Sequence, residues 1–310
     1  ALHRCPWFIF VIHRFPISAP RPSHGESLVI RLRQSSRWGL FFLLLLSVIA
    51  FLAPSLPFED PSAIHLNQRL VEPAWTQAPF LGTDSKGRDL FARIFFGARV
   101  SLATGLFGSL LALFIGIPWG SIAGLLGGKV DRVMMRIADA MESMPMVVLV
   151  LFLLSILSEY RMELDAIGIG RMHVFYLAIG LLFWLPTARI ARAEALRLRS
   201  SSFVQAAQSV GSSRSRILIR HLLPNMAPSL LVMLGITVPR VVLMEAFLSF
   251  LGLGVEPPSI SWGLLAADGL AALNPLVGCW WLLAFPAAAL VASLLALNLV
   301  ADGLRDRLGK

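Results

Sequence analysis

Apolar residues in this 310-residue chain gather in six long runs, and the short segments between them carry most of the charge. A run of about 20 apolar residues is long enough to cross the hydrocarbon core of a bilayer as a helix. The pattern therefore predicts an all-α polytopic membrane protein with six membrane-spanning helices. They are expected at residues 38–56, 100–126, 137–157, 174–190, 226–251 and about 276–300.

Two of these runs have internal features that predict how they pack. In the second run, small residues recur at intervals of four, which lets another helix backbone approach closely. This ladder comprises Gly108, Ala112, Gly116, Gly120 and Gly124. The third run has Asp139 and Glu142 in its first turns, and Pro145 is expected to bend it.

Composition and charge agree with a membrane protein. The chain is 56% hydrophobic and 15% charged, with a mean hydropathy of +0.74. Its net charge of +9 does not indicate nucleic-acid binding, because nineteen of the 27 Lys and Arg residues lie in segments 1–37, 129–136, 189–220 and 302–310. Positive charge concentrates on the cytoplasmic side of membrane proteins, so both termini, including the basic tail 1–37, are predicted to be cytoplasmic. The two cysteines show no disulfide or zinc pattern.

The segments between the first three runs are predicted to be turns and loops. Residues 58–99 are expected to form an external loop that leads into an amphipathic approach helix. Within it, Asp84, Arg88 and Asp89 are expected to pair with one another and with nearby backbone amides, and a substrate contact is the alternative. The GGKVD segment, 127–131, lacks the spacing of a phosphate loop and predicts a tight turn with Asp131 as a helix N-cap.

Residues 203–225 form the one long polar interruption in the second half of the chain. Ser201 or Ser202 is expected to cap a short amphipathic helix that Gly211 ends. A second helix is expected to begin at Ser212 or Ser213 and to stop at Pro224 and Asn225. Together they predict a helix–Gly–helix elbow on a membrane surface, with Arg214, Arg216 and Arg220 facing lipid headgroups or another protein. A basic surface loop without a partner is the alternative.

The elbow resembles a known motif. The spacing of Gln205-Ala206-Ala207, Gly211 and His221-Leu222-Leu223-Pro224 is similar to the EAA loop of ABC importer permeases, although Gln205 stands where that family usually has Glu. Further segments resemble, in the same order, the second permease subunit of oligopeptide and dipeptide ABC importers. They are 81–89 (LGTDSKGRD), 127–131 (GGKVD), 245–254 (EAFLSFLGLG), 257–263 (PPSISWG) and 302–308 (DGLRDRL).

The resemblance implies a type I ABC importer permease in the bacterial inner membrane. The hydrophobic pattern predicts a first helix and external loop at 38–80, and the resemblance implies a permease core at 81–310 with a coupling loop at 201–225. It also implies a second permease, two ATPase subunits that bind the ATP, and an external solute-binding protein, with no cofactor or catalytic residue in this chain. The coupling residues it implies are Phe203, Gln205, Ala206, Ala207, Gly211, His221, Leu223, Pro224 and Asn225.

Other classes of function have less support in the sequence. An enzyme would need convergent polar residues, and neither HExxH nor GxSxG occurs. An ion-driven carrier would need ionisable residues at the membrane midplane, where Arg240 and Glu245 are the candidates. Glu245 is a possible pathway residue, or a structural acid bonded to the Gly-rich turn that follows it. The cargo is left open among dipeptides, longer peptides, nickel chelates and other small solutes.

Overall fold

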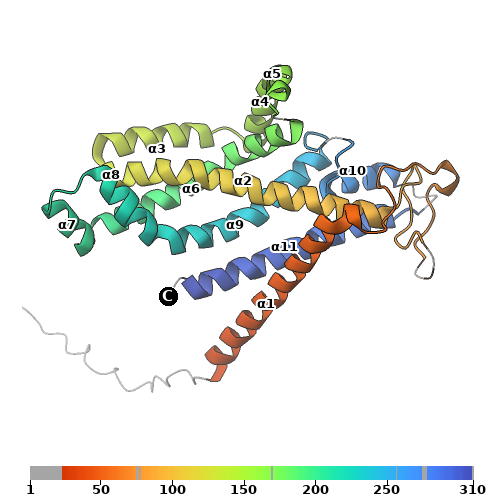
Figure 1. The fold of residues 1–310 in the computed structure, drawn as a ribbon, viewed down its shortest axis with the longest axis horizontal. Helices are drawn as coiled ribbons and strands as arrows, with labels where there is room; N and C mark the ends of the chain where they lie inside the picture. Colours follow the sequence, from red (N-terminus) through yellow and green to blue (C-terminus); the bar gives the residue numbers. More distant parts are fainter. Residues whose placement is uncertain are drawn as a thin grey trace, which may run out of the picture.

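The computed structural model describes residues 23–308 except 75, 77, 169, 256 and 274–277, so most of the basic tail lies outside the described residues. The described chain is almost entirely helical (Figure 1). Its α-helices are α1 Ser23–Leu52, α2 Leu90–Leu126, α3 Gly128–Glu142, α4 Met146–Glu159, α5 Arg161–Ala166, α6 Arg171–Arg199, α7 Ser202–Ser209, α8 Arg214–Ile217, α9 Leu223–Phe250, α10 Trp262–Ala272 and α11 Trp281–Leu308. A π-helical turn, Leu218–Leu222, joins α8 to α9.

Five helical segments in this described part are long and apolar enough to cross a membrane. They are Ser36–Ser55, Leu90–Leu126, Met172–Arg199, Arg214–Phe250 and Trp281–Leu308. The bent pair α3–α4 makes a sixth if it is counted as one span. The multi-pass helical architecture predicted from the hydrophobic pattern is therefore confirmed.

The small-residue ladder of α2 is buried, and most of it faces α6. A Cβ atom on Gly120 would lie 2.0 Å from the carbonyl oxygen of Ala188, and one on Gly116 would lie 2.6 Å from Cβ of Thr187. No real side chain tolerates such distances, so only glycine allows the two backbones to approach this closely. The prediction that the ladder packs against protein is confirmed.

The third predicted span differs from expectation. It consists of two helices, α3 and α4, which meet at 92° across the break at residues 143–145. Pro145 lies in this break, where its missing N–H and its ring prevent α3 from continuing. Asp131 lies in the first turn of α3 but is not its N-cap; Gly127, with φ of +65°, occupies that position. The predicted N-cap is therefore wrong, and the Asp131 side chain is bound to α6 instead.

Other boundaries differ as well: α1 begins at Ser23, within the predicted tail, and α6 continues to Arg199. The expected approach helix is not separate, because α2 begins at Leu90 and runs unbroken through the second span. The sixth span, expected to end near residue 300, continues as helix to Leu308 in α11. Near that end α11 packs against α1: a Cβ on Gly303 would overlap the hydroxyl of Ser36.

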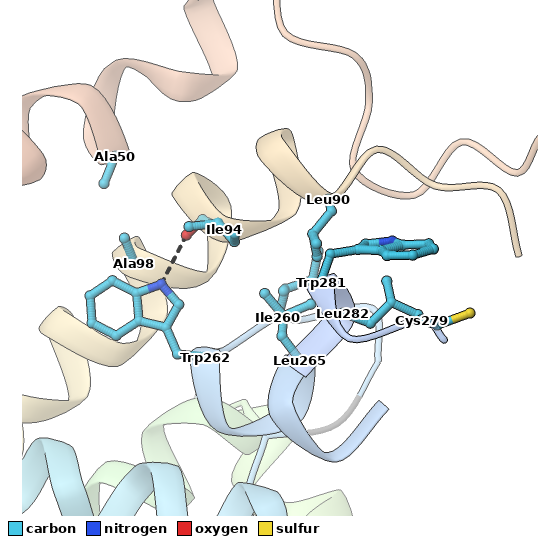
Figure 2. Packing of buried hydrophobic residues seen from close by; sticks show 10 residues of the cluster. All are labelled: Ala50, Leu90, Ile94, Ala98, Ile260, Trp262, Leu265, Cys279, Trp281 and Leu282. Atoms are coloured by element: carbon cyan, nitrogen blue, oxygen red, sulfur yellow. Dashed lines mark hydrogen bonds between the residues drawn. The ribbon is translucent and has the colours of Figure 1, made fainter. Parts of the chain in front are cut away.

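At the opposite end of the bundle from α7 and α8, the short helix α10 fills the space between α2, α9 and α11 (Figure 1). Trp262 is fully buried there, and its indole N–H donates to the carbonyl oxygen of Ile94 at 3.0 Å (Figure 2). Gly269 lets α10 approach the backbone of α11, where a Cβ would lie 2.3 Å from the carbonyl oxygen of Leu282. The sequence pattern did not predict α10, because its 11 residues are too few for a span.

Candidate functional site

The elbow begins where α6 ends, at one end of the bundle (Figure 1). Ser201 is the N-cap of α7, as expected, but its hydroxyl donates to the carbonyl oxygen of Leu198 and makes no cap hydrogen bond. Gln205 donates its side-chain amide to the carbonyl oxygen of Ser200 at 3.2 Å. A glutamate carboxylate cannot donate this bond, so glutamine adds a contact between α7 and the end of α6.

Gly211 ends α7 as predicted. Its φ is +81°, and the amides of Gly211 and Ser212 bond back to the carbonyl oxygens of Gln208 and Ala207. These two bonds form a Schellman motif, in which a left-handed residue closes the helix. Ser213 then caps α8 by accepting from the amide of Arg216 at 3.4 Å. The helix–Gly–helix shape predicted for the elbow is confirmed.

The expected stop at Pro224 and Asn225 is wrong. The chain passes from α8 through the π-turn directly into α9, and Pro224 lies in the first turn of α9, within this continuous helical segment. In the π-turn the amide of Leu223 bonds five residues back to Leu218, which changes the register just before the proline. Asn225 donates its side-chain amide to the carbonyl oxygen of His221 at 2.6 Å and reinforces the same turn.

One face of the elbow anchors it to the bundle. Val204, Ile217 and Leu222 are buried in a cluster with residues from the ends of α2 and α6. Ala207 and Leu223 are half-buried, and Ala207 packs against this cluster. Leu125 of α2, Ala195 of α6 and Met226 of α9 belong to the same cluster, so the elbow packs against all three helices.

The other face of the elbow is open. Val210 is 87% exposed, Phe203 is exposed, and a Cβ placed on Gly211 would meet nothing within 4 Å. Gln205, Ala206, Pro224 and Asn225 are exposed as well, and His221 is half-buried. The basic side chains of Arg214, Arg216 and Arg220 are also exposed. The elbow thus exposes apolar and basic groups on its outer face, while its inner face packs against the helix bundle.

The two candidate pathway residues differ in burial. Arg240 is exposed on α9, whereas Glu245 is fully buried. The carboxylate of Glu245 accepts from the hydroxyls of Ser101 and Ser249 at 2.8 Å each. Ser249 in turn accepts from the amide of Val255, which holds the Gly-rich turn after α9. These bonds are those of a structural acid, and a pathway role for either residue stays a prediction.

A charged network lies at the end of the bundle opposite the elbow. Asp84 is buried, and its carboxylate accepts from Nε of Arg88 at 2.7 Å and from Nη1 of Arg93 at 2.5 Å. Asp89 does not pair with Arg88; it caps α2 by accepting from the amides of Phe91 and Ala92. The expected self-pairing therefore holds for Asp84 and Arg88, and Asp89 satisfies backbone amides alone.

The sequence did not predict two members of this network. Arg93 is 2% exposed and extends from Asp84 to Asp268 on α10, whose carboxylate lies 3.3 Å from Arg93 Nη2. These partners are 175 residues apart in sequence, so no local spacing indicates the contact. One signal was present: a charged residue within an apolar helix is rarely buried without a partner.

The Asp84→Asn substitution is expected to destabilise this end of the molecule by about 3–5 kcal/mol, because it leaves the buried Arg93 guanidinium without its closest carboxylate. The measurement is the thermal unfolding of the purified protein, with Asp306→Asn on an exposed turn of α11 as the control. Equal unfolding temperatures for the two variants would contradict the expectation.

The stability difference between wild type and Asp84→Asn is also expected to depend on pH. Burial alone would raise the pKa of Asp84, but the Arg88 amide, the Arg93 charge, the Lys86 amide and the Arg88 charge together hold it below 3.8. Since the folded pKa is depressed, the stabilisation is present above the unfolded value and is lost as pH falls through the folded value. The stability difference between wild type and Asp84→Asn should therefore shrink below about pH 3.8.

A family model described as "Binding-protein-dependent transport system inner membrane component" matches residues 116–310. The chain is 38% identical over 270 residues to the oligopeptide transport system permease protein OppC of Bacillus subtilis, covering 87% of this chain and 83% of that one. It is 34% identical over 294 residues to the dipeptide transport system permease protein DppC of the same organism, covering 94% and 87%.

Similarity extends to another relative and to a solved structure. The OppC protein of Escherichia coli K12 is 38% identical over 273 residues, covering 87% of this chain and 85% of that one. A solved structure of the MetNI methionine ABC transporter in inward-facing conformations matches with a TM-score of 0.55 at 17% identity, covering 70% of this chain and 97% of that one. At this identity the match shows a shared fold.

Proposed function

Because this chain belongs to the family of binding-protein-dependent transport system inner membrane components, we propose that it is a permease subunit of an ATP-driven importer of oligopeptides or dipeptides. The peptide cargo is inferred from relatives at 34–38% identity that are named as oligopeptide and dipeptide permeases. The chain itself does no chemistry in this proposal: ATP is bound and hydrolysed by partner ATPase subunits, and a second permease completes the transport path.

The observation that carries the proposal is the construction of the elbow. Its inner face is fixed to α2, α6 and α9 through Val204, Ile217 and Leu222, while Phe203 and Val210 stand exposed on its outer face. A surface that is apolar, exposed and rigidly backed is suited to insertion into a groove on a soluble partner. In this proposal the groove belongs to an ATPase subunit, and its closure on ATP displaces the elbow and the helices attached to it.

The positions of the elbow and the long loop support the orientation. The elbow lies at one end of the bundle, and the 56–89 loop, with the Asp84 network, lies at the other (Figure 1). With the elbow and both termini on the cytoplasmic side of a bacterial inner membrane, the loop faces outward, where a solute-binding protein delivers the peptide. ATPase and binding protein therefore act from opposite sides.

Vectorial uptake tests the proposal. The full complex, reconstituted in proteoliposomes, is supplied with a labelled oligopeptide and its binding protein on one side and ATP on the other. Accumulation is expected only when the two are on opposite sides, and a non-hydrolysable ATP analogue is the control. Peptide movement that is independent of ATP, or that proceeds with ATP and binding protein on the same side, would contradict it.

A further inference from the structure

A row of ion pairs, to which the proposed function assigns no role, attaches helix α3 to α6. The guanidinium of Arg192 donates to both oxygens of Asp131, from Nε at 2.5 Å and from Nη2 at 2.6 Å. One helical turn earlier, Arg189 donates to Asp139 at 2.7 Å and also pairs with Glu142. Two arginines on one helix thus bind three carboxylates on the other.

The ion pairs lie beside a small apolar contact between α3 and α6. Only Asp131 and Ala138 are buried among the residues of α3, and the remaining contacts with α6 come from half-buried methionines such as Met135. The Asp131 carboxylate is 10% exposed, whereas the side chains of Arg189, Asp139 and Glu142 are all more than 40% exposed. Exposed pairs contribute little, so the bidentate Arg192–Asp131 pair is the strong link.

The helix that carries both arginines leads directly into the elbow. After Arg192, α6 binds α9 where Glu194 accepts from the hydroxyl of Ser229 at 2.8 Å, and it ends at Arg199 just before α7. At the far end of α3 the chain turns by 92° into the apolar helix α4. The ion pairs therefore lie between the element that would move with the ATPase and a bent membrane segment.

We propose that Arg192 and Asp131, assisted by Arg189 with Asp139 and Glu142, are positioning residues that carry the displacement of the elbow from α6 to the bent α3–α4 segment. This inference rests on the proposed function. Charged pairs suit the role because they fix the register of two helices that share few buried side chains. When the link is broken, ATP hydrolysis continues but no longer moves α3 and α4 in step with α6.

Charge reversal and charge exchange test the inference in the complete reconstituted transporter. The variants are Arg192→Asp, Asp131→Arg and the double variant with both changes, and peptide uptake and ATP hydrolysis are measured on the same preparations. Each single reversal is expected to lower the number of peptides taken up per ATP by about 5-fold or more, within the range of typical coupling between sites. The double variant restores the pair with its charges exchanged and is expected to recover most of this ratio.

The ratio separates coupling from simple loss of structure, because a poorly assembled complex loses uptake and hydrolysis in proportion. Arg132→Glu is the matched control: it reverses a charge on an exposed residue of α3 that makes no ion pair among the described residues, and the ratio should not change. If the single reversals fail to assemble, Arg192→Lys keeps the charge but loses the two-pronged geometry, and a lowered ratio is expected there.

An unchanged ratio in the assembled single reversals or in Arg192→Lys would overturn the inference, as would a double variant that recovers assembly without recovering the ratio. These outcomes are distinct from failure of the proposed function, since that would appear as an absence of ATP-dependent uptake in the wild-type complex.

Discussion

Replacing Gly120 with leucine is expected to prevent the transmembrane bundle from assembling. A Cβ at this position would lie 2.0 Å from the carbonyl oxygen of Ala188 and 2.8 Å from the amide nitrogen of Arg192, and both are backbone atoms. Backbone cannot rotate away as a side chain can, so α2 and α6 would have to separate. The cost is expected to reach or exceed the upper end of the about 1–3 kcal/mol that overpacking usually costs.

The yield of folded protein after membrane extraction measures this effect. Gly120→Ala should already be harmful, since the first carbon atom causes the overlap. Gly170→Leu is the matched control, because a Cβ on Gly170 would meet nothing nearer than a ring nitrogen of His173 at 3.9 Å. Normal yield for Gly120→Leu would mean that the close contact between α2 and α6 does not exist in the membrane.

The ladder also illustrates what the sequence could predict. Small residues at four-residue intervals lie on one face of a helix, so the periodicity alone indicates that a second backbone lies against that face. Gly211 and the serines around it predict the elbow for a similar reason, since caps and left-handed residues act within a few positions of chain. Features that depend on local geometry could therefore be predicted from the sequence.

Features that depend on partners distant in the sequence could not be predicted in this way. Arg93 binds Asp268, and Arg192 binds Asp131, over separations of 175 and 61 residues. The residue types were visible, but a charge in an apolar helix has many possible partners until the fold brings one of them close. Asp131 shows the consequence: its position after two glycines favoured a cap, and the tertiary ion pair determined its role instead.

The sequence predicted a bend at Pro145, but it predicted neither the full break there nor the π-turn before Pro224, because a proline in a helix has two possible outcomes. Pro145 coincides with a full break between α3 and α4, whereas Pro224 sits within a continuous helix because the preceding π-turn changes the hydrogen-bond register. The sequence shows that each of these positions lacks an N–H, but the packing of neighbouring segments decides whether the helix ends there.

Placing a charge on the open face of the elbow is expected to abolish transport without harming the fold. Ala206 is exposed on α7, and glutamate is a good helix former, so Ala206→Glu should leave α7 intact. Gly211→Asp adds bulk and charge beside it, with on the order of 1 kcal/mol of strain from the positive φ. Ala207→Glu is less informative, because Ala207 packs inward and the change would also disturb the anchoring cluster.

The expected result for Ala206→Glu and Gly211→Asp is normal membrane insertion with ATPase association and peptide uptake lowered by more than about tenfold, since an unpaired buried carboxylate costs several kcal/mol and each 1.4 kcal/mol is about tenfold in affinity. Insertion, ATPase co-purification and uptake are measured separately. Ala166→Glu on the exposed side of α5 introduces the same side chain away from the elbow and should leave all three unchanged. Full uptake in both elbow variants would make residues 201–225 an ordinary surface loop, because an apolar groove that holds Phe203 and Val210 would not accept a carboxylate beside them.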